Sequence, residues 1–400
     1  MVNDNSNKTR AVRFIVLMGL ISLFADMTYE GARGITGPYL SYLGASAAVV
    51  GFVGGLGELV GYGLRLLTGY WADRTRRYWV LTIIGYSINM LAVPLLALAG
   101  RWEVAAFLII AERLGKAIRT PSRDAMLSHA TRQVGTGWGF GLHEALDQVG
   151  AVSGPLIVAA TMFFAHNRYQ AGFGVLLIPA VLALTILFIS RQLYPNPQDL
   201  ETQHTHYQVI KDGRLPRVFW LYTAFMAVSI AGFTRFQLVS YHLRAEGVVP
   251  DFQIPILFAV AMGMDALVAL PIGRLFDKRG LLTLLALPAL TLPIPFLVFS
   301  RAYVSVLLGV VLWGAAMGVQ ETVMKAAVAE IVPPERRGTA YGVFNLGFGL
   351  AWFLGSAAMG ILYDVNVSYV IALAVVLELI SVPLIFLVRR AVKAAQMRPA

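Results

Sequence analysis

The stretch GYWADRTRRYWVL, residues 69–81, follows one long apolar segment and precedes another. A similar stretch, GRLFDKRGLLTLL, occupies residues 273–285 at an equivalent place in the second half of the chain. Both begin with Gly, carry Asp four residues later, continue with a cation and end in Leu. Two copies of one loop in equivalent surroundings predict that the chain consists of two repeated halves.

The composition of the chain indicates a membrane protein. Hydrophobic residues make up 58% of its 400 positions and charged residues only 14%, with a mean hydropathy of +0.68. A soluble domain of this length needs more polar surface, because water meets most of its exterior. An apolar stretch of about 18 residues or more crosses the hydrocarbon core as a helix. We predict twelve such spans, at residues 12–37, 47–70, 79–99, 104–127, 138–164, 171–190, 218–242, 252–272, 282–299, 303–329, 338–362 and 368–388.

The net charge of +10 is distributed as a topology signal. An excess of Lys and Arg between spans marks the cytoplasmic side of a membrane protein. We therefore expect an integral protein of the cell membrane (inner or plasma membrane) with both termini in the cytoplasm, and no nucleic-acid partner. With twelve spans and a cytoplasmic N-terminus, the opposite side carries only Arg101, Arg168, Arg244 and Arg301.

A polar stretch without an apolar run, residues 191–217, divides the chain and contains three prolines. Such a composition is typical of a linker. We predict an all-α polytopic membrane protein in which this cytoplasmic linker joins two pseudo-symmetric six-helix bundles, residues 1–190 and 218–400. Repeated six-helix halves are typical of a secondary transporter.

The repeated loop resembles the signature of the major facilitator superfamily, in which Gly, Asp and basic residues recur between spans two and three. The resemblance implies the superfamily's fold, transport by alternating access, and a gating role for both loops. An Asp in such a loop can cap a helix or pair with a cation of the neighbouring bundle, and that contact breaks when the transporter changes state. The cytoplasmic gate predicted in this way comprises Gly69, Asp73, Arg74, Arg77, Gly273, Asp277 and Lys278, with Arg123 and Asp124 at the inner end of span four.

A second motif, GAVSGP at residues 150–155, lies in the fifth predicted span. Small residues at positions i and i+4 let two helices approach closely, and Pro bends a span. We therefore predict that Gly150, Gly154 and Pro155 serve helix packing. The motif resembles the G-x-x-x-G-P element of the drug:proton antiporter branch of the superfamily, which implies efflux by proton antiport.

The fourth predicted span carries the charged run AERLGKAIRTPSRDA, residues 111–125. Glu112, Lys116 and Arg119 share one helical face, and a pair between Glu112 and Lys116 at i, i+4 is expected. Because charges facing lipid cost several kcal/mol, this face must meet protein or a water-filled cavity. In the superfamily, spans one, four, seven and ten line the central cavity. The predicted substrate cavity comprises Glu112, Lys116, Arg119, Tyr29, Arg235, Gln320 and Glu321.

Carboxyl groups in the first and fifth spans are candidates to carry a coupled proton. Burial in a low dielectric disfavours the charged form of a carboxyl group. Asp26 and Glu30 share one face of span one, and Glu144 and Asp147 lie in the inner half of span five. The sequence HEALD around Glu144 is not H-E-x-x-H, so it predicts no zinc site.

Three functions remain open at this point. The first is proton-coupled export of a small organic solute. The second is an anion carrier for a carboxylate or a phosphate ester, which Lys116, Arg119 and Arg235 would bind. The third is a non-transporting membrane sensor on the same fold. In each case we expect a monomer in the lipid bilayer, with a small-molecule ligand, no cofactor, no metal ion and no enzymatic activity, since the chain has no nucleophile, base and oxyanion set in one place and no Walker A loop.

Overall fold

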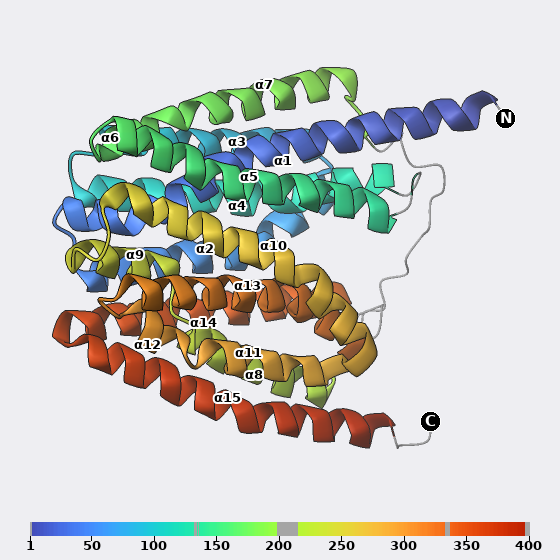
Figure 1. The fold of residues 1–400 in the computed structure, drawn as a ribbon. Coiled ribbons are helices and arrows are strands. Elements are labelled where there is room, and N and C mark those ends of the chain that lie inside the picture. The colour runs from blue at the N-terminus through green and yellow to red at the C-terminus, as the bar shows by residue number, and fades with distance from the viewer. Residues whose placement is uncertain (1, 132–133, 135, 198–214, 333–336, 397–400) are drawn as a thin grey trace. The chain divides into compact units, whose positions relative to one another are not determined.

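The computed structural model describes residues 2–131, 134, 136–197, 215–332 and 337–396, and every regular element in these ranges is a helix (Figure 1). The predicted all-α fold is therefore confirmed, and each of the twelve predicted spans is helical over most of its length. The first helices are α1 (Val2–Tyr42), α2 (Ala47–Thr75), α3 (Tyr78–Leu95), η1 (Leu96–Leu98), α4 (Trp102–Thr131), α5 (Thr136–Phe164), α6 (Tyr169–Val175) and α7 (Leu177–Leu193). The later ones are α8 (Arg217–Gly232), α9 (Phe236–Ala245), η3 (Asp251–Gln253), α10 (Ile254–Arg279), η4 (Gly280–Leu285), α11 (Ala286–Thr291), α12 (Ile294–Val298), α13 (Tyr303–Ile331), α14 (Arg337–Val365) and α15 (Val367–Gln396).

Ten helical segments of the described chain are long and apolar enough to cross a membrane. The count is lower than the twelve predicted spans for two reasons. Residues 251–298 count as one helical segment that covers two predicted spans. The other reason is α4, which is absent from the ten and carries six charged residues between positions 112 and 124. The composition of α4 alone would not place it in a membrane, so its charged face needs protein around it.

Three predicted spans are interrupted rather than continuous. The span predicted at 218–242 breaks after Gly232, because the backbone of Phe233 and Arg235 is extended. The indole nitrogen of Trp313 donates a hydrogen bond of 2.8 Å to the carbonyl of Thr234, which satisfies the backbone at this break. A broken helix within a span is typical of transporter binding sites.

Proline accounts for the other two interruptions. The span predicted at 282–299 is divided into η4, α11 and α12, with Pro293 between the last two. The span predicted at 171–190 is divided at Leu176, and Pro179 follows three residues later. Proline has no backbone N–H and cannot donate to the carbonyl four residues earlier, so it weakens the helix on its N-terminal side.

The chain forms two compact units. The first contains Met1–Tyr39, Leu64–His206 and Asp251–Ala259, and the second contains Leu40–Gly63, Tyr207–Pro250 and Val260–Ala400. Residues 198–214 of the predicted linker lie outside the described residues, and the division into bundles at 191–217 stays a prediction.

Close packing of helices in the first unit fixes the position of two polar side chains. A Cβ atom at Gly85 of α3 would lie 2.6 Å from the backbone nitrogen of Arg119, and one at Gly115 of α4 would lie 2.5 Å from that of Asn89. Only glycine permits this approach. The contact brings Arg119 and Asn89 to the interface of α3 and α4.

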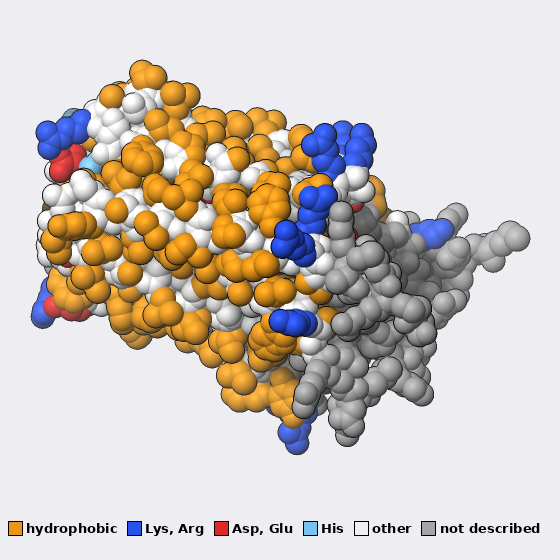
Figure 2. Space-filling view, turned by 90° about the horizontal axis from the view of Figure 1, so that it is seen from below, with side chains coloured by type: hydrophobic (Ala, Val, Ile, Leu, Met, Phe, Trp, Pro, Cys, Tyr) orange, Lys and Arg blue, Asp and Glu red, His pale blue; other side chains and the backbone are white. Residues whose placement is uncertain are grey.

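The surface suits a lipid environment. Figure 2 shows one face of the molecule. Hydrophobic side chains cover most of its described part, and Lys and Arg side chains gather toward its ends. Large apolar side chains such as Leu98, Phe164 and Leu270 are at least 73% exposed. Lipid can cover such surface, whereas water would not favour so much of it.

Candidate functional site

The first unit buries a group of charged side chains that α1, α4 and α5 supply. On α1, the Tyr29 hydroxyl donates a hydrogen bond of 2.5 Å to Asp26, and Arg33 donates one of 2.9 Å to Glu30. Spacings of three and four residues place these side chains on one helical face. Asp26, Tyr29 and Glu30 are at most 8% exposed. The carboxyl groups of α1 therefore lie inside the unit, and their role in proton coupling stays a prediction.

Two cations of α4 rest on aromatic rings. The ammonium of Lys116 lies 3.9 Å from the centre of the Tyr29 ring, and the guanidinium of Arg119 lies 4.2 Å from the centre of the Tyr86 ring. A cation over an aromatic face is attracted by the ring quadrupole. Tyr29 thus links α1 and α4, because its hydroxyl bonds to Asp26 of α1 and its ring contacts Lys116 of α4.

Arg119 is fully buried, with no exposed surface. Within the described residues, its three guanidinium nitrogens have no hydrogen-bond acceptor. The carboxylates of Asp26 and Asp147 are close enough to act on it electrostatically, but neither forms an ion pair with it in the described chain. A buried cation without hydrogen bonds is costly, so this guanidinium is available to an anionic group.

Glu112 faces α3 rather than the cations of its own helix. Its Oε1 atom accepts a hydrogen bond of 2.8 Å from Asn89, and its Oε2 atom lies 3.0 Å from Nε of Arg113. The expected pair between Glu112 and Lys116 is therefore wrong for the described residues. The reason is that Asn89, held against α4 by the glycine contact, turns the carboxylate toward α3.

Asp147 of α5 stands at the end of a chain of polar contacts that starts at Arg123. The Arg123 guanidinium donates a hydrogen bond of 3.1 Å to the Ser22 hydroxyl. The same hydroxyl lies 2.8 Å from Nε2 of His143. Nδ1 of His143 lies 3.4 Å from Asp147. Because Ser22 accepts from Arg123, its own proton is directed to Nε2, and the His143 proton then sits on Nδ1 and faces Asp147. The second carboxylate oxygen of Asp147 has no partner among the described residues.

Six of the predicted residues of the first unit lie close together. Asp26, Tyr29, Glu30, Lys116, Arg119 and Asp147 gather around the interface of α1, α4 and α5, and we call these six the charged cluster. Glu144 is exposed and makes no ion pair in the described part of the chain. Arg123, predicted as a gate residue, also holds Asp124 at 2.8 Å.

Four residues that complete the site carried no usable signal in the sequence. Ser22, Tyr86 and Asn89 lie in apolar spans, and each hydroxyl or amide there is as typical of packing as of function. His143 can titrate near neutrality, but a lone His in a span is more often a hydrogen-bonded packing residue. Their contacts depend on which helices meet, which no single-helix pattern encodes.

A second polar group lies in the second unit, at the break between α8 and α9. Arg235 donates hydrogen bonds of 2.9 Å to Glu58 and 3.1 Å to Gln237. Its guanidinium lies 5.0 Å from the centre of the Trp352 ring. Gln320 is 2% exposed, and neither polar atom of its amide has a hydrogen-bond partner within the described chain. Glu321, next to it, is exposed. Of the predicted cavity residues here, Arg235 and Gln320 are buried and Glu321 is not.

The predicted gate residues of the two repeated loops lie near helix ends. Arg74 donates to the Tyr70 hydroxyl at 3.2 Å, and Arg77, Asp277 and Lys278 are exposed. The side chain of Asp73 lies outside the described residues. Gly69 and Gly273 face Pro121 and Thr322 at ordinary contact distances. Their gating role stays a prediction.

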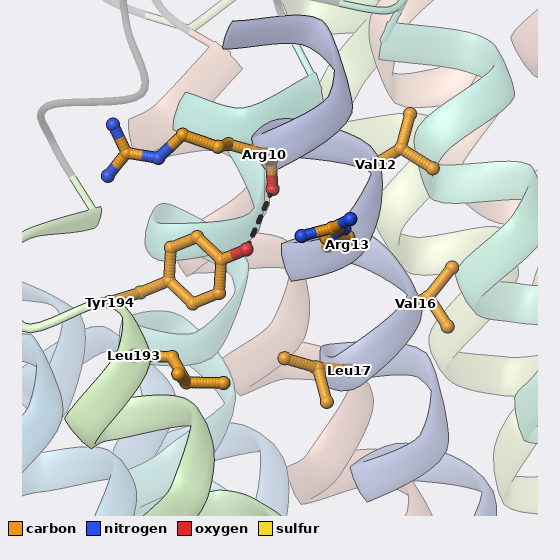
Figure 3. A pocket seen from close by; sticks show the side chains of 7 residues that line it. All are labelled: Arg10, Val12, Arg13, Val16, Leu17, Leu193 and Tyr194. Atoms are coloured by element: carbon orange, nitrogen blue, oxygen red, sulfur yellow. Dashed lines mark hydrogen bonds between the residues drawn. The ribbon is translucent and has the colours of Figure 1, made fainter. Parts of the chain in front are cut away.

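One pocket of the first unit lies apart from the charged cluster. It has a volume of about 510 Å³ and opens between the start of α1 and the end of α7, where Figure 3 shows Arg10 and Arg13 beside Leu17, Leu193 and Tyr194. The Tyr194 hydroxyl donates 3.2 Å to the carbonyl of Arg10. Its position near the first turns of α1 separates it from Asp26 by several turns.

Comparisons with known proteins give a consistent result. The family model described as Major Facilitator Superfamily matches residues 18–321 and 251–399. An uncharacterised protein of Mycobacterium tuberculosis is 42% identical over 382 residues, which cover 95% of this chain and 93% of that protein. The multidrug resistance protein MdtH of Photorhabdus laumondii is 26% identical over 336 residues, which cover 82% of this chain and 80% of that protein.

A solved structure shares the fold. A bacterial homologue of the human lysosomal transporter Spinster, in an inward-facing and unoccupied conformation, superposes with a TM-score of 0.78. The alignment covers 98% of this chain and 99% of that chain at 15% identity. At that identity the likeness concerns the fold alone.

Proposed function

Because this chain belongs to the major facilitator superfamily and is an integral membrane transporter, we propose that it exports a small organic solute in exchange for protons, by alternating access. The observation that carries the proposal is the contact of Tyr29 with both Asp26 and Lys116. The likeness to the multidrug resistance protein MdtH also favours efflux.

The charged cluster supplies a physical reason for exchange. When Asp26 is ionised, it offsets the positive charge of Lys116 and Arg119, and when it takes up a proton that offset is lost. A buried site whose net charge changes by one unit cannot bind the same solute equally well in both forms. A cationic solute would therefore compete with the proton for one cluster, which is the thermodynamic requirement for antiport.

The test uses the purified protein in liposomes, with an imposed pH gradient and a panel of cationic and neutral amphiphiles. We expect the gradient to drive accumulation of at least one of them, and a protonophore to abolish it. Asp26→Asn should lose gradient-driven transport and keep solute exchange in the absence of a gradient. Glu103→Gln, a change at an exposed residue that pairs with Arg101, is the matched control. Fluxes that ignore the gradient for every compound would refute proton coupling.

A second function, transport of an organic anion such as a carboxylate or a phosphate ester, is favoured by Arg119. Its guanidinium is buried and lacks an acceptor among the described residues, while Arg235 is already paired with Glu58. A planar guanidinium binds such anions through two parallel hydrogen bonds. A panel of organic anions should then raise the unfolding temperature of the protein, and Arg119→Gln should lose this response. Stabilisation by cations alone would exclude it.

The orientation and state of assembly complete the proposal. The charge distribution favours a cell-membrane protein with both termini in the cytoplasm. We also propose two six-helix bundles joined at residues 191–217, and a monomer. Cysteine labelling with a membrane-impermeant reagent tests the orientation directly, since the natural chain contains no cysteine. A cysteine placed at Arg398 should react only after the membrane is opened.

A further inference from the structure

Glu378 is a buried carboxyl group that the charged cluster does not use. It lies on α15, eleven residues into the apolar segment Val367–Val392, which places it about 17 Å from the start of that segment along the helix. Its side chain is 1% exposed. An ionisable residue at the middle of a span is costly and therefore marks a site that needs explanation.

Three hydroxyl groups surround the Glu378 carboxyl. Ser229 of α8 lies 3.3 Å from both carboxyl oxygens, and Ser381, one turn along α15, lies 3.4 Å from one of them. Thr291 of α11 contacts the same carboxyl. Hydrogen bonds to an ionised carboxylate are shorter, about 2.5–2.7 Å from a hydroxyl. The Ser229 and Ser381 contacts are longer than those that hold a bare carboxylate.

The protons of two hydroxyls also bond to backbone carbonyls. The Ser381 hydroxyl donates a hydrogen bond of 2.7 Å to the backbone carbonyl of Glu378, and the Thr291 hydroxyl donates one of 2.9 Å to that of Leu287. A hydroxyl has one proton and two lone pairs. Ser381 also donates to the carboxyl at 3.4 Å, so the protons of these two hydroxyls are shared with backbone carbonyls, whereas Ser229 donates to the carboxyl oxygens. Two shared protons and the long Ser229 contacts satisfy a buried carboxylate poorly, which favours the protonated acid.

Charged neighbours are also scarce. In the described chain Glu378 forms no ion pair. Of the elements packed against α15, η4, α11 and α12 have no charged residue. Charges on α8 and α14 stand at their ends, at Arg217, Arg337 and Asp364, and Asp364 bonds to the backbone of α2. The titratable tyrosines of these two helices are Tyr222, Tyr341 and Tyr363, and α15 itself carries Tyr369, Arg389 and Arg390 near its ends.

We propose that Glu378 is a second proton-binding site, which holds a proton while α8, α11 and α15 pack as they do here and releases it when that packing opens. The ligand is the proton, and the three hydroxyls form the site. Gly232, the last residue of α8, lies against Leu377 and Glu378, since a Cβ there would be 3.0 Å from Leu377 and 3.5 Å from Glu378. Loss of the proton would therefore disturb the helix break that carries Arg235.

The proton site itself does not depend on the proposed export, and only its use in coupling rests on that function. Infrared spectra of the purified protein detect the carbonyl stretch of a protonated carboxyl group directly. At neutral pH we expect such a band in the natural protein and its loss in Glu378→Gln. The control is Glu103→Gln, because the backbone N–H of Glu103 and the Arg101 guanidinium hold the pKa of the Glu103 carboxyl below its usual range. This control should leave the band unchanged.

A second measurement separates proton binding from a structural role of the side chain. Glutamine resembles the protonated acid in shape and stays neutral, so Glu378→Gln should fold, unfold at a temperature close to that of the natural protein at pH 6, and lose less stability between pH 6 and pH 9. An identical band in both proteins, or identical pH profiles, would overturn the proposal. Stabilisation of the natural protein by Na⁺ over K⁺ that Glu378→Gln abolishes would also overturn it, because the site would then hold a metal cation. None of these readouts requires transport, so their failure is distinct from failure of proton-driven export.

Discussion

Arg235 lies 2.9 Å from Glu58 although 177 positions separate them in the sequence. Both side chains are buried, and Arg235 is placed there by the extended backbone at the break between α8 and α9. An uninterrupted helix would have given Arg235 a different direction. The broken helix and the ion pair are therefore one feature of the second unit.

Removing one partner of this pair should destabilise the protein strongly. A buried charge left without its partner costs about 3–5 kcal/mol, so Glu58→Gln should lower the unfolding temperature markedly, and the double change Glu58→Gln with Arg235→Gln should recover part of it. The exposed pair of Glu246 and Arg301 is the control, because exposed pairs contribute about 0–1 kcal/mol. An equal loss of unfolding temperature at the two pairs would show that the buried ion pair contributes no more to stability than the exposed one.

The two functions of Tyr29 can be separated by substitution. Tyr29→Phe keeps the ring under Lys116 and removes only the hydrogen bond to Asp26, whereas Tyr29→Leu removes both. A desolvated cation–π contact contributes about 2 kcal/mol. In the proteoliposome assay, we therefore expect Tyr29→Leu to transport at least several-fold more slowly than Tyr29→Phe. Indistinguishable rates would mean that the ring does not position Lys116.

The lack of hydrogen bonds at Arg119 leads to an unusual expectation. Replacing a buried, poorly satisfied charge by an apolar side chain of similar length is often neutral or stabilising, by about 1–4 kcal/mol. Arg119→Met should therefore unfold at or above the temperature of the natural protein when no anion is present, and should no longer respond to organic anions. A large loss of stability in Arg119→Met without anions would reveal a partner for the guanidinium within the protein.

Packing of α5 against α1 should depend on two glycines of the GAVSGP motif. A Cβ atom at Gly150 would overlap the carbonyl of Leu23, and one at Gly154 would overlap that of Met27. Overpacking of this kind costs about 1–3 kcal/mol, so Gly150→Ala and Gly154→Ala should each lower the unfolding temperature. Gly141→Ala lies on the same helix with no atom within 4 Å, and should change the temperature little. A matching loss in Gly141→Ala would point to backbone propensity instead of contact.

Local patterns in the sequence were sufficient for the helices but not for the helix breaks or the pairs between helices. The helices follow from apolar runs, and the charged face of α4 follows from the spacing of Glu112, Lys116 and Arg119. The break before Arg235 could not be predicted, because residues 233–235 contain no proline and the carbonyl there is satisfied by Trp313 from another helix. The surroundings of Glu378 are equally non-local, since its hydroxyls come from three helices.

The glycine contact between α3 and α4 also predicts that backbone amides exchange with solvent at different rates in different parts of the protein. With the backbones of Gly85 and Gly115 against each other's helix, amide groups along that interface can exchange with solvent deuterium only if two long helices separate together. In the second unit, α11 and α12 have only six and five residues and are divided near Pro293. Helices this short open locally at low free energy. Deuterium uptake should therefore be slowest along α3 and α4 and fast in α11 and α12, next to the hydroxyl of Thr291.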